Sequence, residues 1–182
     1  MRYLKPNISL YILLFLTFTT SYGQAVDEYT LKAIWIGKFT HFIDWPQTRT
    51  ENEDYFTIST LSSHPIQDKL ELIYKDHYIW NKPVLVNEQS INSVDSTINI
   101  LYIPKQKSIE EVKVIVLNAR KHGILLIADT EGYAELGVHI NFFFDEQRIR
   151  FEINETAMRE SDFFISYRLL NIAKIIKPIE IE

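Results

Sequence analysis

The chain of 182 residues contains no cysteine, which excludes disulfide bonds, thiolate metal sites and cysteine nucleophiles together. The small number of glycines, 5 in all, also disfavours a glycine-rich phosphate loop. Basic residues are outnumbered, 19 Lys and Arg against 24 Asp and Glu, so that the formal net charge is −5. Because nucleic-acid binders usually present a basic face, we predict that the protein has no nucleic-acid partner.

What the chain does contain is the balance of a folded soluble protein, with 46% hydrophobic and 24% charged residues. Aromatic residues make up 13%. At about 100–200 residues per domain, the length predicts one domain. A chain of this size buries enough surface for a core that needs no covalent staples.

The first residues have the composition of an export signal. A positively charged start precedes an uncharged apolar stretch over 8–20, and small residues follow up to Gly23. We therefore predict a cleaved signal peptide at 1–23, a single mature domain at 24–182, and a periplasmic location. The alternative is a retained N-terminal anchor, although the dense apolar part, Leu10–Phe18, is short for a bilayer span of about 20 residues.

Capping residues and apolar periodicity predict the secondary structure of the mature chain. Ser108 with Glu111 forms a capping box, and Gly123 marks the end of the helix behind it. The apolar run Ile124–Ala128 is typical of a strand covered on both faces. The predicted elements are a helix from Asp27 to near Asp44, a strand Tyr55–Leu61, a helix behind Pro65, strands Pro83–Val86 and Ile98–Ile103, a helix from Ser108, a strand Ile124–Ala128, hairpin strands Val138–Phe144 and Arg148–Ile153, a helix Asn154–Arg159 and a helix at about Ser166–Ile176.

Strands that alternate with helices favour a layered α/β sandwich. We predict a mostly parallel sheet with one antiparallel hairpin and with helices on both faces. The stripe Leu31, Trp35, Phe39 and Phe42 is expected to form the buried face of the first helix. Asn154 is expected to cap the short helix that follows the hairpin.

No recognisable catalytic constellation is present. None of the 5 histidines stands four residues from another, and neither His-Glu-x-x-His nor Gly-x-Ser-x-Gly occurs. His41 lies beside Asp44 without a nucleophile motif, and we interpret the histidines as surface or edge residues. His139 alternates away from the apolar face of its strand, so that it either lines a groove or faces water. We therefore predict no catalytic residue, no cofactor and no metal.

An acidic loop follows the buried strand. Asp129, Glu131 and Glu135 lie where α/β sheets place ligand sites, and their oxygens could hold a hydrated cation. Their spacing matches no calcium loop. We favour the interpretation that they are solvated surface acids.

Aromatic and arginine side chains supply the candidates for a partner or ligand surface. Trp45 stands next to a proline bend and Phe143 lies on the hairpin, and both are candidates for exposed aromatic residues. The alternative, which we favour for each residue taken singly, is a position in the core. Binding surfaces favour Trp, Tyr, Phe and Arg. We predict that Trp45 and its neighbours, together with the connection Arg159–Phe164, which includes Phe163, form part of a partner or dimer surface.

Arg168 is a further candidate because an arginine within an apolar helix is costly unless it is paired or lies at an edge. It is expected to pair with Asp162, Glu155 or the Asn154 loop, or to reach a ligand carboxylate.

Two stretches resemble a known family. Lys32–Pro46 (KAIWIGKFTHFIDWP) is similar to that family's opening helix, which runs into a Trp-Pro pair. Phe151–Asn154, followed by Ala157, resembles its strand-to-helix junction, and Ile165–Leu170 resembles its closing Ile-Ser-x-Arg-Leu-Leu helix. The family is that of YfiR, small exported bacterial proteins, and the resemblance in order and spacing spans about Tyr29–Ile175.

The resemblance implies a periplasmic α/β domain, often dimeric, to which no catalysis is ascribed. The best-known member of the family represses a membrane-bound diguanylate cyclase by engaging its periplasmic sensor part, and related domains accompany sensor histidine kinases. Some relatives carry disulfides, which this chain cannot form.

Two functional hypotheses follow. The first is a non-catalytic exported regulator that binds the periplasmic part of a membrane signalling protein, of the diguanylate cyclase (cyclic-di-GMP) or sensor kinase type, with a possible homodimer. The second is a periplasmic small-molecule-binding module or minor hydrolase with a site on the strand-end loops. Its support is limited to His41 with Asp44, Asp129 with Glu131, and Arg168.

Overall fold

The computed structural model describes residues 27–46, 53–106, 108–146 and 148–176. The predicted signal peptide at 1–23 lies outside the described residues. The helices are α2 (Glu28–Phe39), α3 (Ile66–Tyr74), α4 (Ile109–His122), α5 (Glu155–Glu160) and α6 (Tyr167–Leu170). The strands are β1 (Ile43–Asp44), β2 (Phe56–Leu61), β3 (Tyr78–Ile79), β4 (Lys82–Gln89), β5 (Ile100–Ile103), β6 (Leu125–Ala128), β7 (Ile140–Asp145), β8 (Arg148–Asn154), β9 (Phe164–Ile165) and β10 (Lys174–Ile176).

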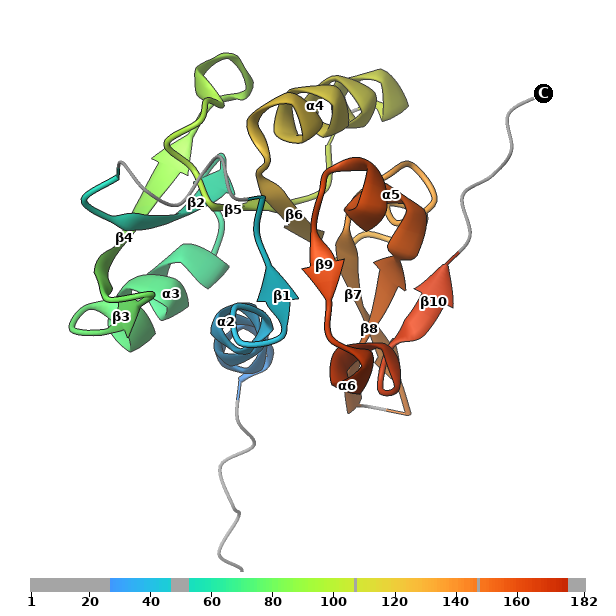
Figure 1. Cartoon of the computed structure of the whole chain (residues 1–182), viewed down its shortest axis with the longest axis horizontal. Coiled ribbons are helices and arrows are strands. Elements are labelled where there is room, and N and C mark those ends of the chain that lie inside the picture. Colours follow the sequence, from blue (N-terminus) through green and yellow to red (C-terminus); the bar gives the residue numbers. More distant parts are fainter. Residues whose placement is uncertain (1–26, 47–52, 107, 147, 177–182) are drawn as a thin grey trace, which may run out of the picture.

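An 8-stranded sheet with the order β10-β8-β7-β6-β5-β2-β4-β3 forms the centre of the molecule (Figure 1). Neighbouring strands from β7 to β4 run parallel, as do β10 and β8. The β7–β8 hairpin and the β3–β4 pair are antiparallel. The predicted α/β class, with a mostly parallel sheet and an antiparallel hairpin, is confirmed.

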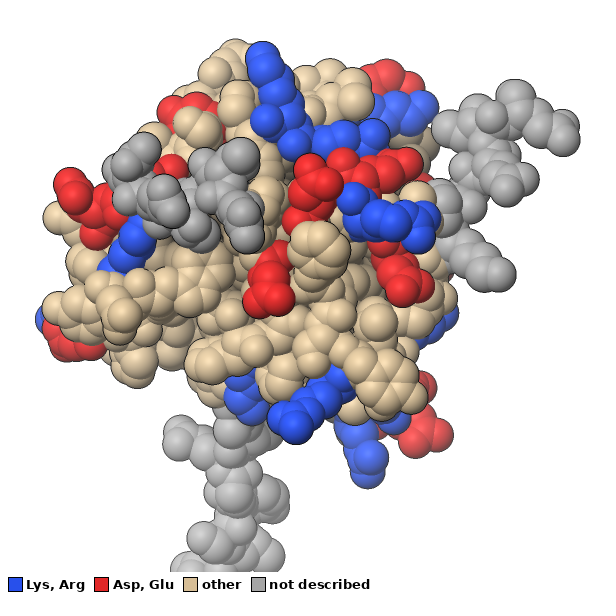
Figure 2. All heavy atoms as spheres, in the orientation of Figure 1, with Lys and Arg blue, Asp and Glu red and all other residues tan. Residues whose placement is uncertain are grey.

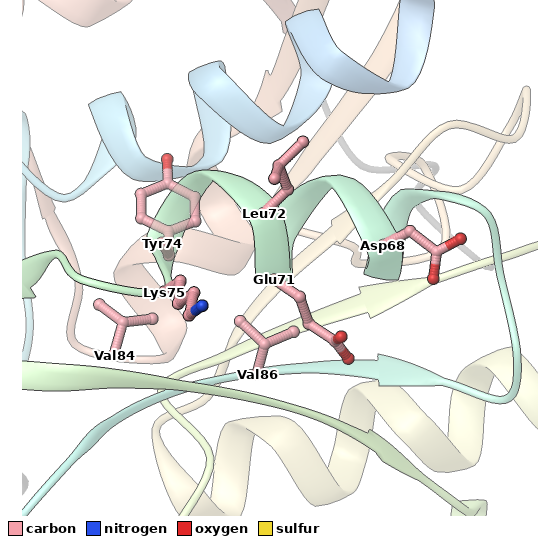
Figure 3. Close-up of a pocket in the computed structure, with 7 residues that line it drawn as sticks. All are labelled: Asp68, Glu71, Leu72, Tyr74, Lys75, Val84 and Val86. Carbon is pink, nitrogen blue, oxygen red and sulfur yellow. The ribbon is translucent and has the colours of Figure 1, made fainter.

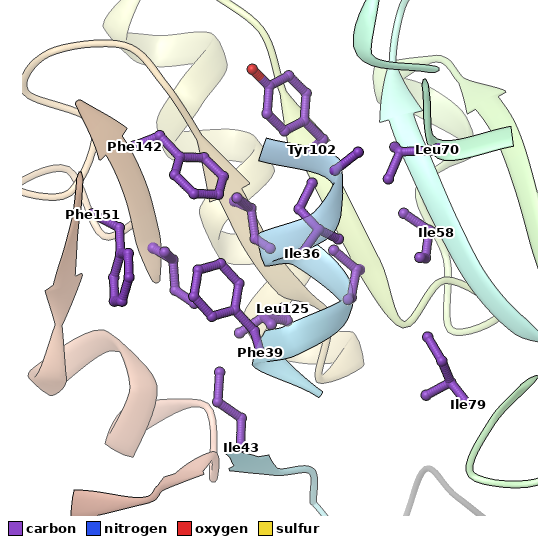
Figure 4. Close-up of a cluster of buried hydrophobic side chains, with 14 of the residues drawn as sticks. Ile36, Phe39, Ile43, Ile58, Leu70, Ile79, Tyr102, Leu125, Phe142 and Phe151 are labelled. Carbon is purple, nitrogen blue, oxygen red and sulfur yellow. The ribbon is translucent and has the colours of Figure 1, made fainter. Parts of the chain in front are cut away.

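The alternation of side chains along the central strands explains why helices cover both faces of the sheet. In β6, Leu125 and Ile127 join the hydrophobic cluster beneath α2 and α3, whereas Leu126 and Ala128 join the cluster beneath α4. Successive residues of a strand point to opposite faces, so that a strand covered on both sides is apolar throughout. Figure 4 shows Phe39 pointing from α2 toward the hairpin strands.

Helix α4 begins and ends where the capping residues predict. The Ser108 hydroxyl accepts a hydrogen bond from the Glu111 backbone N–H (3.2 Å). At the other end Gly123 adopts a left-handed conformation with φ 58°. A side chain is strained in that conformation, which makes glycine the usual residue after the last helical turn.

The opening helix ends earlier than predicted. It stops at Phe39. The backbone N–H groups of the next three residues bond to carbonyls three positions back, and the chain then extends into β1, which pairs with β9. Its buried face also differs from the predicted stripe: Ala33 and Ile36 are fully buried with Phe39, whereas Trp35 is only partly buried.

The predicted last helix is wrong over most of its length. Only Tyr167–Leu170 is helical, and Lys174–Ile176 instead forms β10 beside β8. The β-branched pair Ile175 and Ile176 favours an extended backbone, and parallel pairing with β8 satisfies its hydrogen bonds. The ammonium of Lys174 also bonds to Glu152 on β8 (3.2 Å).

Asn154 does more than cap α5. Its side-chain oxygen accepts from the Ala157 N–H (2.8 Å), and its amide nitrogen donates to the Ala134 carbonyl (2.7 Å) in a buried setting. We predict that Asn154→Ala lowers the free energy of unfolding by about 2–4 kcal/mol, because a lost cap costs about 1 kcal/mol and a stranded buried carbonyl about 1–3 kcal/mol.

The exposed cap of α4 provides the matched control for thermal or urea unfolding. Ser108→Ala removes a cap hydrogen bond alone and should cost about 1 kcal/mol. Equal losses for the Ser108 and Asn154 variants would contradict a second structural role for Asn154.

Candidate functional site

Trp45 belongs to the core rather than to the surface, so the prediction of an exposed ring at this position is wrong. Only 6% of the residue is exposed. Its ring makes edge contacts with Phe56, Trp80 and Phe163, at centroid distances of 6.1, 4.8 and 5.4 Å, and its Nε1 donates to the Asn99 carbonyl (3.4 Å). Edge-to-face aromatic packing of this kind stabilises a buried indole that also has a hydrogen-bond partner.

Phe163 is also buried, being 3% exposed, but Arg159 is exposed and shares a groove with it. The groove has a volume of about 280 Å³ and lies between α5 and β9. Phe164, which is 71% exposed, adds an aromatic ring to its wall. The full lining consists of Glu155, Met158, Arg159, Asp162, Phe163, Phe164, Ile165 and Leu170.

The surface around this groove combines charge with apolar area. Figure 2 shows charged side chains of both signs gathered over α5, and a largely uncharged area between β9 and α6. Tyr167 and Phe164 are among the most exposed aromatic residues of the described chain. This is the type of composition found at protein–protein interfaces.

Arg168 is exposed on α6 and forms no ion pair with any described residue. The expected pairing with Asp162 or Glu155 is therefore wrong. The reason for expecting an ion pair does not apply to this exposed side chain, because a guanidinium in water needs no carboxylate partner. Arg168 lies on the helix that contributes Leu170 to the groove.

Phe143 lies away from this groove. Its half-buried ring on β7 faces the ammonium of Lys174 at 5.5 Å, and it lines a second cavity of about 580 Å³. Asn141, on the same strand, is 1% exposed. Its Oδ1 has no hydrogen-bond partner among the described residues, whereas its amide nitrogen donates to Glu152 (3.1 Å). A buried oxygen that accepts no hydrogen bond costs free energy, so Oδ1 of Asn141 retains the capacity to accept one.

A buried lysine stands in the wall of the same cavity. Lys32 on α2 is 2% exposed and bonds to Glu28, one turn away, and to Asp129 (2.6 Å). Although burial alone would lower the pKa of Lys32, the two carboxylates hold this pKa above its usual value. Asp129, predicted to be a solvated acid, is therefore a structural ion-pair partner.

A third hollow, of about 450 Å³, lies between α3 and β4. Figure 3 shows Val84 and Val86 pointing from β4 toward α3, with Glu71 and Lys75 extending from the helix. This hollow lies at the opposite end of the sheet from the α5–β9 groove.

The histidines do not form a catalytic arrangement with the predicted partners. The Nδ1 of His41 lies near the Gly37 carbonyl (3.3 Å) and the Thr40 hydroxyl (3.4 Å), and not near Asp44. Within the described residues, no group of three or more His, Cys, Asp or Glu side chains is placed to hold a metal ion.

His139 is buried, and the prediction of a groove or water-facing position is wrong. Its Nδ1 accepts from the Leu126 backbone N–H (2.9 Å), which leaves the proton on Nε2 to be donated to the Ser161 hydroxyl (2.9 Å). The predicted alternation does not hold here, because β7 begins only at Ile140: Val138 belongs to the cluster beneath α4, whereas Ile140 belongs to the cluster beneath α2 and α3. The sequence also could not show that Ser161, at the end of α5, contacts the ring. Burial, with a smaller contribution from the charge of Arg120, lowers the pKa of His139 to about 3.

Comparison with known proteins supplies the family. The family model described as YfiR/HmsC-like matches residues 29–174. The chain belongs to the YfiR/HmsC-like family. This confirms the resemblance carried by the Trp-Pro and Ile-Ser-x-Arg-Leu-Leu segments.

The fold of this YfiR/HmsC-like chain is similar to that of a conserved domain protein from Vibrio cholerae O1 biovar El Tor str. N16961. The TM-score is 0.56 at 11% identity, over 81% of this chain and 60% of the other. At that identity the likeness shows the fold alone. No curated protein matches the chain.

The YfiR/HmsC-like family is known for periplasmic regulators and is regulatory rather than catalytic. None of the helices in the described part of the chain is long and apolar enough to span a membrane.

The buried His139 predicts an acid-sensitive fold. Its pKa in the folded protein lies below the ordinary value of 6.5, so the unfolded chain binds the proton more tightly. The contribution of neutral His139 to the free energy of unfolding is therefore complete above about pH 6.5. It declines toward pH 3 by up to about 1.4 kcal/mol per pH unit for one proton. We expect His139→Gln to flatten this acid decline in urea unfolding measured between pH 4 and pH 8.

Exposed His41 is the matched control. His41→Gln should keep the acid decline of the parent protein, because it leaves the buried His139 in place. If the His139 variant retained the full decline, proton uptake by this ring would not be its cause.

Proposed function

We propose that this chain is a non-catalytic exported regulator that binds the periplasmic part of a membrane signalling protein, of the diguanylate cyclase or sensor kinase type, and thereby controls it. The observation that carries the proposal is the exposed Phe164 ring beside the α5–β9 groove. Membership of a family of periplasmic regulators supports the same role.

The groove has the layout of an anchoring pocket. Met158 and Phe163 form a buried apolar floor, while Arg159 and Asp162 are exposed charged residues in its lining. Hot spots at interfaces are commonly single aromatic or aliphatic side chains that fill such pockets, surrounded by polar groups that exclude water. A volume of about 280 Å³ suits one large side chain of a partner, with Phe164 packing beside it.

A photo-crosslinking amino acid at position 164 tests the proposal in cells that export the protein. We expect a crosslinked product that contains the periplasmic part of a membrane-bound cyclase or kinase, identified by mass spectrometry. Phe164→Ala should weaken binding to that partner by about 2 kcal/mol, roughly thirtyfold, because it removes an aromatic anchor while the buried floor stays intact.

The control position is Ile109, an exposed apolar residue at the start of α4. A crosslinker there should not yield the same product. Equal labelling at both positions, or crosslinks at 164 to a second copy alone, would contradict this assignment of the groove.

A small-molecule-binding module is the second candidate, and the unpartnered Oδ1 of Asn141 in the wall of the 580 Å³ cavity is the observation in its favour. On this hypothesis, protein purified from the periplasm should carry a small molecule visible by native mass spectrometry. Asn141→Leu should abolish the added mass, whereas Asn118→Leu on α4 should retain it. A spectrum of unliganded protein under mild conditions would argue against this candidate.

A further inference from the structure

Over most of its length, the outer edge of β4 has no partner strand among the described residues. On its inner side β4 pairs in parallel with β2, from Phe56 opposite Val84 to Leu61 opposite Gln89. On its outer side the short β3 pairs only with Lys82 and Pro83. Figure 1 shows β3 beside one end of β4 alone. Within the described residues, no strand pairs with the outer edge over Val84–Gln89.

Backbone hydrogen bonds identify the groups that this edge presents. The Val84 N–H donates outward to the His77 carbonyl (3.2 Å), and the Gln89 carbonyl accepts on the β2 side from the Ser62 N–H (3.0 Å). Because the bonding side alternates along a strand in a parallel pair, the N–H and C=O groups of Val86 and Glu88 face outward. Unpaired groups of this kind are a template for one more strand.

This edge lacks the devices by which proteins usually prevent such pairing. Exposed edges are commonly blocked by proline, by lysine, by a bulge or by a very short strand. Pro83 and Lys82 stand only where β3 already covers the edge. The segment Val84–Gln89 contains neither residue type, and its register with β2 continues without a bulge.

Hollows on both faces of β4 could receive the side chains of an added strand. One face presents Val84 and Val86 to the hollow of about 450 Å³ beside α3 (Figure 3). The opposite face presents Leu85 to a hollow of about 280 Å³ that Tyr55 also lines. An extended peptide points alternate side chains to alternate faces, so that both hollows would be filled by one strand.

The charge around this edge determines which strand fits. Asp54 lines the smaller hollow, and none of the described residues in this lining is Lys or Arg. The larger hollow contains Asp68 and Glu71 against the single Lys75. A second copy of the chain would bring the same excess of acids against this one, which disfavours symmetric β4–β4 pairing.

We propose that the outer edge of β4 pairs with an extended segment of a partner protein in which apolar residues alternate with lysine or arginine. The apolar side chains pack beside Val84 and Val86 under α3, and the basic side chains meet Asp54 on the opposite face. The backbone of Val86 and Glu88 supplies the hydrogen bonds of the new ladder. This site is separate from the α5–β9 groove, and neither proposal depends on the other.

The probe is an end-capped octapeptide of alternating valine and lysine, added to the purified protein. We expect it to slow amide hydrogen exchange at Val86 and Glu88 by about tenfold or more, as for newly paired strand amides. A peptide of alternating valine and glutamate should leave this exchange unchanged. So should a valine–lysine peptide with prolines inserted at positions that must donate to β4.

Two variants test the two parts of the proposal. Glu88→Pro removes an outward N–H without breaking the β2 ladder, and should abolish binding that Glu88→Ala largely retains. Reversing the charge with Asp54→Lys should weaken binding of the lysine peptide and strengthen binding of the glutamate peptide. This second variant tests the proposal even if the proline variant fails to fold.

Three results would overturn the proposal: no protection of Val86 and Glu88 by the lysine peptide, equal binding of both peptides, or protection that depends on protein concentration alone. The last result would mean that a second copy occupies the edge.

Discussion

The packing of α2 against two separate parts of the fold is the interaction on which the rest of the structure depends. Phe39 contacts the rings of Phe142 and Phe151 on the hairpin, at centroid distances of 5.8 and 5.1 Å. On the other side, Gly37 allows Tyr74 of α3 to approach so closely that a Cβ would lie 2.0 Å from its hydroxyl oxygen. That hydroxyl donates to the Ala33 carbonyl (2.9 Å), and burial raises the pKa of Tyr74 to about 12. One helix thus holds both halves of the sheet.

The position of the α5–β9 groove follows from this arrangement through a chain of buried polar contacts. His139 joins the backbone of the central strand β6 to Ser161, the residue that ends α5. Asn154 fixes the start of the same helix. A helix of only 6 residues has little stability of its own, so these bonds and the packing of Met158 must hold it. These contacts attach α5, which forms one wall of the groove, to the central sheet.

Much of the fold could be predicted because several signals act locally. The Ser108 cap, the Gly123 stop and the apolar strand before Asp129 depend on near neighbours in the chain, and the structure confirms them. The surface was predicted less well. Trp45 and Phe163 were both expected to be exposed, but each covers the other in the core. Whether an aromatic side chain is buried depends on what lies opposite it, and that partner is distant in sequence.

The sequence by itself determined the α/β class, the family and the caps of α4 and α5, because periodicity and capping are set by residues within a few positions of one another. The contact of Arg159 with a groove, the burial of His139 and the open edge of β4 were decided only by tertiary structure. Each depends on strand order, and strand order is set by the packing of elements that are far apart in the chain. The run Lys174–Ile176 illustrates the reason: it was predicted to continue the last helix, but it is extended because it pairs with β8, which is distant in the chain.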